Sequence, residues 1–364
     1  MRRLLIGLMA CASCLMGYSQ EADSLSVDTL ATSREVGPIL RTIRGLDRQD
    51  NEYIEPNHYE FSFMLQLTRT YESFNISSNE HSLSLAPDGQ TKIGPYFGWR
   101  WIFLGYTFDI KNIGLSQKGL RKEFDLSIYS SQVGVDLFYR RTGDDYKIRD
   151  VDLGKDIHGD LFEGMPFAGV NVGITGASVY YIFNHGRFSY PAAFSQSTCQ
   201  KISCGSWMAG AGYTHNTLDL DYQLLQDAIN SRLAYKQTIQ LDSGLLFRSI
   251  RYNDFMVSGG YAYNWVFAKN WLFCASGQLA LAYKTSYGKM ADEKRGFDFK
   301  KVNLDGLGRF GVVYNNTRWY AGASAIVRTN KYHTSRFTAN NIFGVFNVYI
   351  GYNFMLKKKY KNQI

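Results

Sequence analysis

The residues of this chain that could take part in catalysis are six histidines, spread from His58 to His333. Only His185, in FNHGRFS, lies beside both a serine and an arginine. A histidine in such a place could act as a general base toward a nucleophilic hydroxyl. No carboxylate follows nearby to orient it. We therefore assign no catalytic residue and interpret His185 as a turn residue, while an enzyme acting on lipid or glycan stays an alternative function.

A stronger candidate for binding is the segment GRFSYPAAFSQSTCQKIS, residues 186–203. Pro191 cannot donate a hydrogen bond to a sheet ladder, so an inward fold or a constriction is favoured over a regular strand. Polar side chains of this segment could then line an interior and select a solute by charge and hydrogen bonding. The candidates are Arg187, Ser189, Tyr190, Gln200 and Lys201. In the alternative interpretation, they only tie one rim of the fold together.

Cys199 and Cys204 are five positions apart. In an oxidising compartment, the four residues between them could form a loop that brings their Cα atoms within bridging distance. If both lay on one extended strand and faced opposite sides, the bridge could not form. A disulfide between these two cysteines is therefore an open expectation.

The acidic loop 143–168 contains carboxylates and a histidine that could hold Ca²⁺. Their spacing does not match an EF-hand loop, so we expect plain solvation, no metal and no cofactor. Nucleic acid is also excluded as a partner, because six of the +8 formal charges lie on Arg2, Arg3 and four C-terminal lysines. The rest of the chain has no concentrated basic face.

The elements that must position these residues are extended strands. In YEFSFMLQLTR, the residues Tyr59, Phe61, Phe63, Leu65 and Leu67 share one parity, which gives an apolar face and a polar face. The same alternation predicts twelve strands, near 59–72, 91–101, 102–110, 120–131, 132–142, 169–184, 197–216, 252–268, 271–286, 301–315, 317–330 and 341–356.

Most of these strands exceed the roughly 5–6 residues usual in soluble sheets and the about 9–11 needed to cross a bilayer. Aromatic residues make up 15% of the chain, with 26 Tyr and 24 Phe. Short turns near 131–132, 268–270 and 315–316 alternate with long connections. The exception is 185–196, which we interpret as an unusual inward connection. These features predict an all-β, transmembrane antiparallel β-barrel with long extracellular loops and short periplasmic turns.

The last strand tests this interpretation. Residues Phe346, Val348, Ile350, Tyr352, Phe354 and Leu356 are expected to face lipid, and Val345, Asn347, Tyr349, Gly351 and Asn353 the interior. Barrel closure would remove the unpaired edge. The strand also resembles the C-terminal signal that the barrel-assembly machinery recognises, although eight residues follow it. A helix is predicted from Asp221, which could serve as its N-cap.

Four segments follow from this pattern. MRRLLIGLMACASCLMGYS has the charged start, apolar stretch and small residues of a secretory signal peptide, residues 1–19. We expect a periplasmic lead-in at 20–57, the barrel at 58–356 and a basic periplasmic tail at 357–364. The expected location is the bacterial outer membrane.

Three separated stretches, NEYIEPNHYEFSFMLQ, KIGPYFGWRWIFLGYTFDI and VYYIFNHGRFSYPAAFSQSTCQKISCGSW, carry a resemblance to a known family. They resemble the Bacteroidetes outer-membrane proteins grouped as the domain of unknown function DUF4421, over roughly residues 50–356. The resemblance implies a signal-bearing outer-membrane barrel and no particular reaction.

The leading functional hypothesis is a passive pore or a barrel that binds a small solute or lipid, its solute unspecified. Besides the enzyme, a second alternative is a structural or partner-binding envelope component with a plugged interior. The lipid bilayer is the expected partner in every case.

Overall fold

The computed structural model describes residues 49–78, 80–99, 102–105, 108–110, 122–141, 145–154, 161–232, 240–241, 245, 247–290, 296–333 and 337–361. They belong to one compact unit, Asp47–Ile364. The predicted signal peptide and most of the predicted lead-in segment lie outside the described residues. Among these residues, no helix has the length and apolar character needed to cross a membrane.

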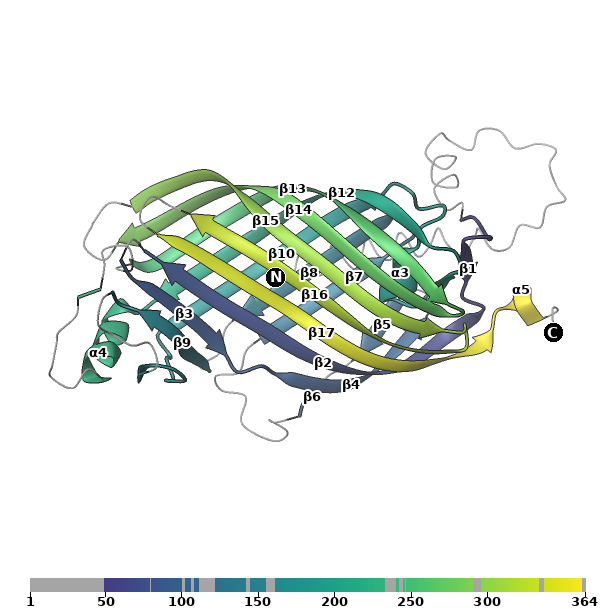
Figure 1. Ribbon diagram of the computed structural model, residues 1–364, viewed down its shortest axis with the longest axis horizontal. Coiled ribbons are helices and arrows are strands. Elements are labelled where there is room, and N and C mark those ends of the chain that lie inside the picture. Colours follow the sequence, from purple (N-terminus) through teal and green to yellow (C-terminus); the bar gives the residue numbers. More distant parts are fainter. Residues whose placement is uncertain are drawn as a thin grey trace, which may run out of the picture. The chain divides into compact units, whose positions relative to one another are not determined.

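The described chain is almost entirely strand (Figure 1). The strands are β1 (Ile54–Pro56), β2 (Tyr59–Ser77), β3 (Ser82–Pro87), β4 (Thr91–Trp99), β5 (Ile102–Gly105), β6 (Phe108–Asp109), β7 (Lys122–Tyr129), β8 (Val133–Arg141), β9 (Tyr146–Asp152), β10 (Val170–Ile182), β11 (Thr198–Gln200), β12 (Cys204–Leu220), β13 (Phe247–Ala268), β14 (Trp271–Met290), β15 (Gly296–Asn315), β16 (Trp319–His333) and β17 (Thr338–Leu356). The helices are α3 (Tyr190–Phe194), α4 (Tyr222–Arg232) and α5 (Lys358–Lys361).

The wall is one antiparallel sheet in the order β5-β4-β2-β17-β16-β15-β14-β13-β12-β10-β8-β7. The predicted number of wall strands, about twelve, is confirmed. The first strand of the wall, β2, pairs with the last strand, β17, along nearly the whole length of both. At the loop end, β3 pairs with both β2 and β9 and so adds a short side branch to the wall.

The sheet curls around an interior, as contacts between residues on opposite sides of the sheet show. Arg309 on β15 pairs with Asp136 on β8, and Arg328 on β16 lies 3.9 Å from Asp125 on β7. Neither pair of strands is adjacent in the sheet. The predicted antiparallel β-barrel architecture is thus confirmed.

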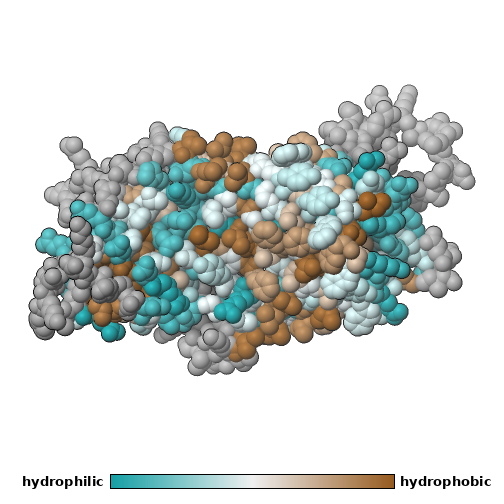
Figure 2. Space-filling model, in the orientation of Figure 1, coloured by the Kyte–Doolittle hydropathy of each residue, from teal (hydrophilic) through white to brown (hydrophobic). Residues whose placement is uncertain are grey.

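The outer face carries an apolar band, and the predicted parity of the last strand is confirmed. Phe346, Val348 and Ile350 are about half exposed, while Gly351 and Asn353 are buried. On β13 the exposed apolar positions run from Phe255 to Phe267, about 40 Å along a strand. At the usual barrel tilt this is a height of about 30 Å. Figure 2 shows such brown side chains gathered between the two ends.

The two ends of the barrel differ. One, the turn end, carries the short connections around 130–132, 269–270 and 316–318 together with β1, α3 and α5 (Figure 1). The other, the loop end, carries β3, β9 and α4. The predicted helix from Asp221 is confirmed, since the Asp221 carboxylate accepts a hydrogen bond from the backbone N–H of Leu224 at 3.0 Å.

Two sequence predictions need correction. The long connections are shorter than predicted, because β2, β13, β14 and β15 continue well past the apolar band. The predicted strand 197–216 begins as a wall strand only at Cys204, since residues 198–200 form β11, which pairs with β1 in a separate two-stranded sheet. The pairing with β1 continues one residue further, since the backbone N–H of Lys201 donates a hydrogen bond of 2.8 Å to the carbonyl of Tyr53.

Candidate functional site: the filled interior of the barrel

The turn end of the interior is occupied by α3, in the segment 185–196 interpreted from sequence as an inward connection. Ser189 caps this helix, because its hydroxyl accepts a hydrogen bond from Ala192 N–H at 3.2 Å. Pro191 fits the first turn, where no N–H partner is needed. Four of the five helix residues are buried. The segment is therefore built as a plug.

Tyr190 places the plug against the wall on several sides. Its hydroxyl donates a hydrogen bond to Ser276 on β14 at 2.8 Å. Its ring meets Tyr129 on β7 at 5.7 Å and Tyr180 on β10 at 5.8 Å. Next to the helix, the Gln196 amide donates to the Tyr349 hydroxyl on β17 at 2.7 Å. Contacts to strands on both sides of the sheet show that the plug lies inside the barrel.

Gln200 fastens the plug to the rim. Its side-chain oxygen accepts a hydrogen bond from Ser189 N–H at 2.8 Å, and its amide donates to Arg187 C=O at 2.7 Å. Asn264 on β13 donates to Ser189 C=O at 2.7 Å and to the Gln200 side-chain oxygen at 3.1 Å. The NH2 groups of both buried amides donate to the plug segment, which gives the plug a fixed position.

The structure divides the five binding candidates from the sequence into two groups. Ser189, Tyr190 and Gln200 are buried within the turn end. Arg187 and Lys201 lie at the surface instead of the interior. Arg187 pairs with Asp50 at 3.6 Å, and Lys201 donates to a backbone carbonyl of the lead-in segment at 3.0 Å. Solute binding by any of the five stays a prediction.

Cys199 and Cys204 are unbridged in the structure, because each thiol has its own neighbours. Cys199 lies 3.8 Å from the carbonyl oxygen of Asn315, and Cys204 lies 3.2 Å from the Asn184 side chain. The first cysteine belongs to β11 and the second begins β12, so they are held by different sheets. Burial raises the pKa of the Cys199 thiol to about 12.

His185 has the surroundings of a turn residue. Its Nδ1 lies 3.3 Å from the carbonyl oxygen of Ile182, and its ring packs edge-on against Tyr181. None of the ion pairs found in the described part of the chain includes His185. This geometry lends the enzyme alternative no support.

Beneath the plug lies a layer of charges centred on Arg309. Its side chain is fully buried, pairs with the equally buried Asp136, and lies 3.4 Å from the Tyr190 hydroxyl of the plug. Its guanidinium also stacks over the Tyr180 ring at 5.0 Å. One arginine thus joins β15, β8, β10 and the plug.

Two further arginines extend this layer across the interior. Arg328 lies 3.7 Å from Asp136 and stacks over Phe138 at 4.9 Å. Arg140 pairs with Asp125 at 3.0 Å and stacks over a phenylalanine of β17 at 4.9 Å. Carboxylates and arginines therefore alternate from one side of the barrel to the other.

A second charged layer lies nearer the loop end. The Lys284 ammonium is 3.0 Å from both Asp254 and Asp305, and all three side chains are buried. Thr214 and Asn216 on β12 donate further hydrogen bonds to Asp254. A buried lysine between two carboxylates is well compensated, so this layer ties β12, β13, β14 and β15 together.

The loop end is closed by an apolar cluster. It contains buried residues of β2, β3, β9, β10, β12, β13, β16 and β17, of α4 and of the neighbouring loops: Phe74, Ile76, Leu83, Leu85, Tyr146, Ile148, Val151, Leu153, Phe162, Phe167, Val170, Val172, Leu218, Leu220, Leu225, Ile229, Leu241, Leu245, Ile250, Tyr332, Phe337 and Ala339. With the plug and the two charged layers, buried side chains lie at both ends of the interior and between them.

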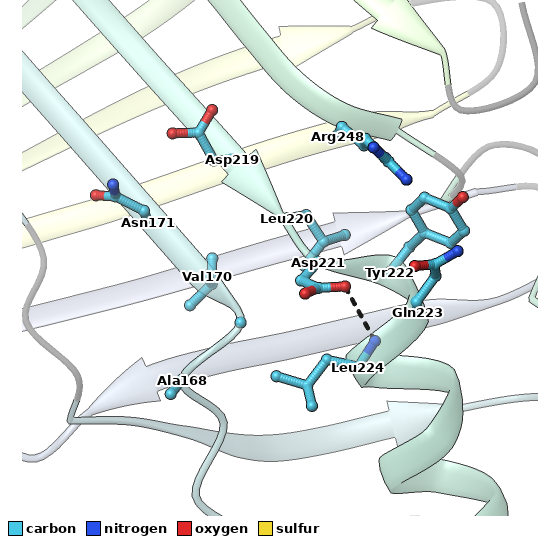
Figure 3. A pocket seen from close by; sticks show the side chains of 11 residues that line it. Ala168, Val170, Asn171, Asp219, Leu220, Asp221, Tyr222, Gln223, Leu224 and Arg248 are labelled. Carbon is cyan, nitrogen blue, oxygen red and sulfur yellow. Dashed lines mark hydrogen bonds between the residues drawn. The ribbon is translucent and has the colours of Figure 1, made fainter.

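Outside this closure, the loop end has a shallow depression of about 550 Å³ (Figure 3). It lies between β10, β12 and the start of α4, and Asp219, Tyr222 and Arg248 line it with neighbouring backbone. In the acidic loop 143–168, residues 143–144 and 155–160 lie outside the described residues. No group of three potential metal ligands occurs among the residues that the structure does describe.

Sequence reasoning missed the charged layers. Their signal was present, because Asp254, Lys284, Asp305 and Arg309 occupy the parity opposite to the apolar outer residues of their strands. Charged residues at inward positions of long strands are typical of a barrel interior. Which of them would meet depends on the strand register and on the curl of the sheet.

Comparison of the sequence with family profiles finds one match, the domain of unknown function DUF4421, over residues 48–354. A comparison with curated protein sequences finds no match.

Solved structures similar to this chain include three bacterial membrane proteins. The outer membrane protease OmpT from Escherichia coli is 7% identical, with a TM-score of 0.37 over 84% of this chain and 100% of that one. The translocator domain of the autotransporter NalP from Neisseria meningitidis is 7% identical, with a TM-score of 0.32 over 86% and 93%. The Pseudomonas putida toluene transporter TodX is 9% identical, with a TM-score of 0.25 over 82% and 91%.

Proposed function

The chain belongs to the DUF4421 family, and we propose that it is an outer-membrane β-barrel with a closed interior. In this proposal the protein serves as a structural or partner-binding component of the envelope. The observation that carries it is the succession of buried groups along the interior: the plug at the turn end, two charged layers in the middle and the apolar cluster at the loop end.

Membrane placement is supported by the outer face. The apolar band of about 30 Å matches the hydrocarbon thickness that a barrel must cover. Aromatic side chains gather near the turn end, where Trp271 contacts Tyr314 at 5.3 Å and Trp319 contacts Tyr352 at 4.5 Å. Such rings favour the interface between lipid and water. Soluble monomers rarely expose contiguous apolar patches larger than roughly a few hundred Å².

The closed interior argues against the passive pore. A porin keeps a water-filled channel between polar side chains, whereas here oppositely charged groups from opposite walls are in contact. The side chains of Arg309 and Asp136 are 0% and 1% exposed to solvent. A solute would have to separate this pair and displace the plug, so passive diffusion is not the function that the geometry supports.

The experiment that tests the closed interior is conductance in planar lipid bilayers. Folded protein, verified by its faster migration in unheated gels, is expected to insert without discrete current steps. A general porin in the same bilayers provides the positive control. Reproducible single-channel steps from the folded protein would contradict the proposal and restore the pore hypothesis.

The partner-binding role needs its own test. Cross-linking in intact cells, followed by purification, is expected to recover a stoichiometric protein partner attached at the loop end or at the β1–β11 sheet. Recovery of the barrel alone would leave the structural role as the remaining form of the proposal.

A further inference from the structure

The C-terminal lysines are held against the turn end. The backbone N–H of Lys357 donates a hydrogen bond to the carbonyl of His58 at 2.9 Å, and its ammonium donates to the carbonyl of Asn57 at 2.8 Å. The Tyr360 ring lies 4.2 Å from the His58 ring. The tail is therefore packed beside the first residues of β2, and Lys358, Lys359 and Lys361 project from it into solvent.

A further cation from another part of the chain lies beside the same strand. Arg318, in the turn between β15 and β16, donates two hydrogen bonds to the Tyr352 hydroxyl at 2.9 and 3.1 Å. Its carbonyl accepts a hydrogen bond from Asn353 N–H at 2.8 Å. Tyr352 lies on β17, shortly before the tail lysines in the sequence. We call Arg318, Lys358, Lys359 and Lys361 the basic rim.

The basic rim is available for a ligand. All four side chains are exposed, and none takes part in the ion pairs found among the described residues. A carboxylate at this end, Glu55, is engaged by His58 at 3.4 Å. The rim therefore presents a net positive surface.

The position of the rim identifies the ligand. Trp319 and Tyr352 mark the edge of the apolar band nearest the turn end. Their rings are in contact directly beside Arg318. A cation just beyond an aromatic girdle lies at the depth of lipid phosphates. Lysine and arginine near an anionic bilayer surface each favour binding by about fivefold.

We propose that the basic rim binds the phosphate groups of anionic phospholipids in the leaflet that faces the turn end. This inference rests on the proposed membrane placement but not on the closed interior. Lipid so bound would anchor the turn end and fix the depth of the barrel. An acidic protein is the competing partner for the same charges.

Fluorescence quenching by brominated phospholipids tests the proposal. The probe is a variant that keeps Trp319 and replaces the other five tryptophans by phenylalanine, reconstituted in vesicles of phosphatidylcholine and phosphatidylglycerol. Brominated phosphatidylglycerol is expected to quench Trp319 with a preference of at least about fivefold over brominated phosphatidylcholine, the contribution of a single cation near the surface. Replacing all four rim cations by glutamine is expected to remove most of this preference, as is high salt.

The matched control replaces four exposed cations at the loop side of the band: Arg69, Arg141, Arg251 and Lys331. It is expected to keep the preference at Trp319. An unchanged preference in the rim variant, or an equal loss in the control, would overturn the proposal. Loss of a co-purifying acidic protein from the rim variant without a change in lipid preference would overturn it as well. Absence of quenching by either brominated lipid would instead refute membrane placement.

Discussion

Replacement of Arg309 by methionine is the perturbation that best tests how the interior is held together. Arg309 is fully buried, and its guanidinium is shared between the Asp136 carboxylate, the Tyr190 hydroxyl and the face of the Tyr180 ring. Methionine fills much of the same space without the charge. The variant therefore leaves the buried Asp136 without its principal partner.

The expected cost follows from that burial. Removing one partner of a buried ion pair typically destabilises a protein by about 3–5 kcal/mol, because the remaining charge is uncompensated. Asp136 keeps a hydrogen bond from Ser127 at 2.6 Å and has Arg328 at 3.7 Å. These groups offset part of the loss, so we expect about 3 kcal/mol, at the lower end of the range.

The assay is reversible urea unfolding in lipid vesicles, with the double variant Arg309→Met, Asp136→Leu as the critical comparison. Because the double variant removes both charges, it is expected to be more stable than the Arg309→Met variant. A single-variant cost below about 1 kcal/mol, or double-variant losses that simply add, would refute the direct pairing of the two residues.

Three further predictions concern single positions. Because burial raises the pKa of Cys199 to about 12, a variant with Cys199 as its sole cysteine is expected to react slowly with maleimide between pH 7 and 9 until it is unfolded. Asp88→Asn is expected to cost about 0.2–1 kcal/mol at pH 7 and low salt, since a hydrogen bond from Lys147 lowers the pKa of this half-exposed carboxyl; the effect should be lost as the pH falls through that lowered pKa, and a cost that persists in the acid would contradict it. Gly351→Ala is expected to cost about 1–3 kcal/mol, because the added methyl would meet a tyrosine ring of β16 at 2.1 Å, whereas Gly259→Ala, with open space around it, is the control.

Much of the wall could be predicted from the sequence, because a strand that separates lipid from a packed interior must alternate with a period of two. In the last strand, Phe346, Val348 and Ile350 are exposed and Tyr349 and Asn353 are buried, as the pattern indicates. The alternation is a local property, so each strand carries it independently. It also identified the segment 185–196 as exceptional.

The interior could not be predicted in the same way. Arg309 and Asp136 are 173 residues apart, and their contact depends on the stagger of all the strands between them. Residues 198–200 are extended like wall strands, yet they pair with β1 outside the barrel. A periodic pattern does not distinguish these two partners. For the same reason, the sequence placed Arg187 and Lys201 with Ser189 among the interior candidates, although they lie at the surface.

The way in which charge is arranged inside the barrel explains why closure should be its stable state. In an open channel each charged side chain is solvated and needs no partner on the far wall. Here Asp136 on β8 lies between Arg309 and Arg328 from β15 and β16, so widening the barrel would separate opposite charges that are already out of water. Each separation would cost several kcal/mol unless water entered at once. The plug and the apolar cluster add buried contacts at the two ends, so opening would require the ion pairs, the plug and the cluster to separate together.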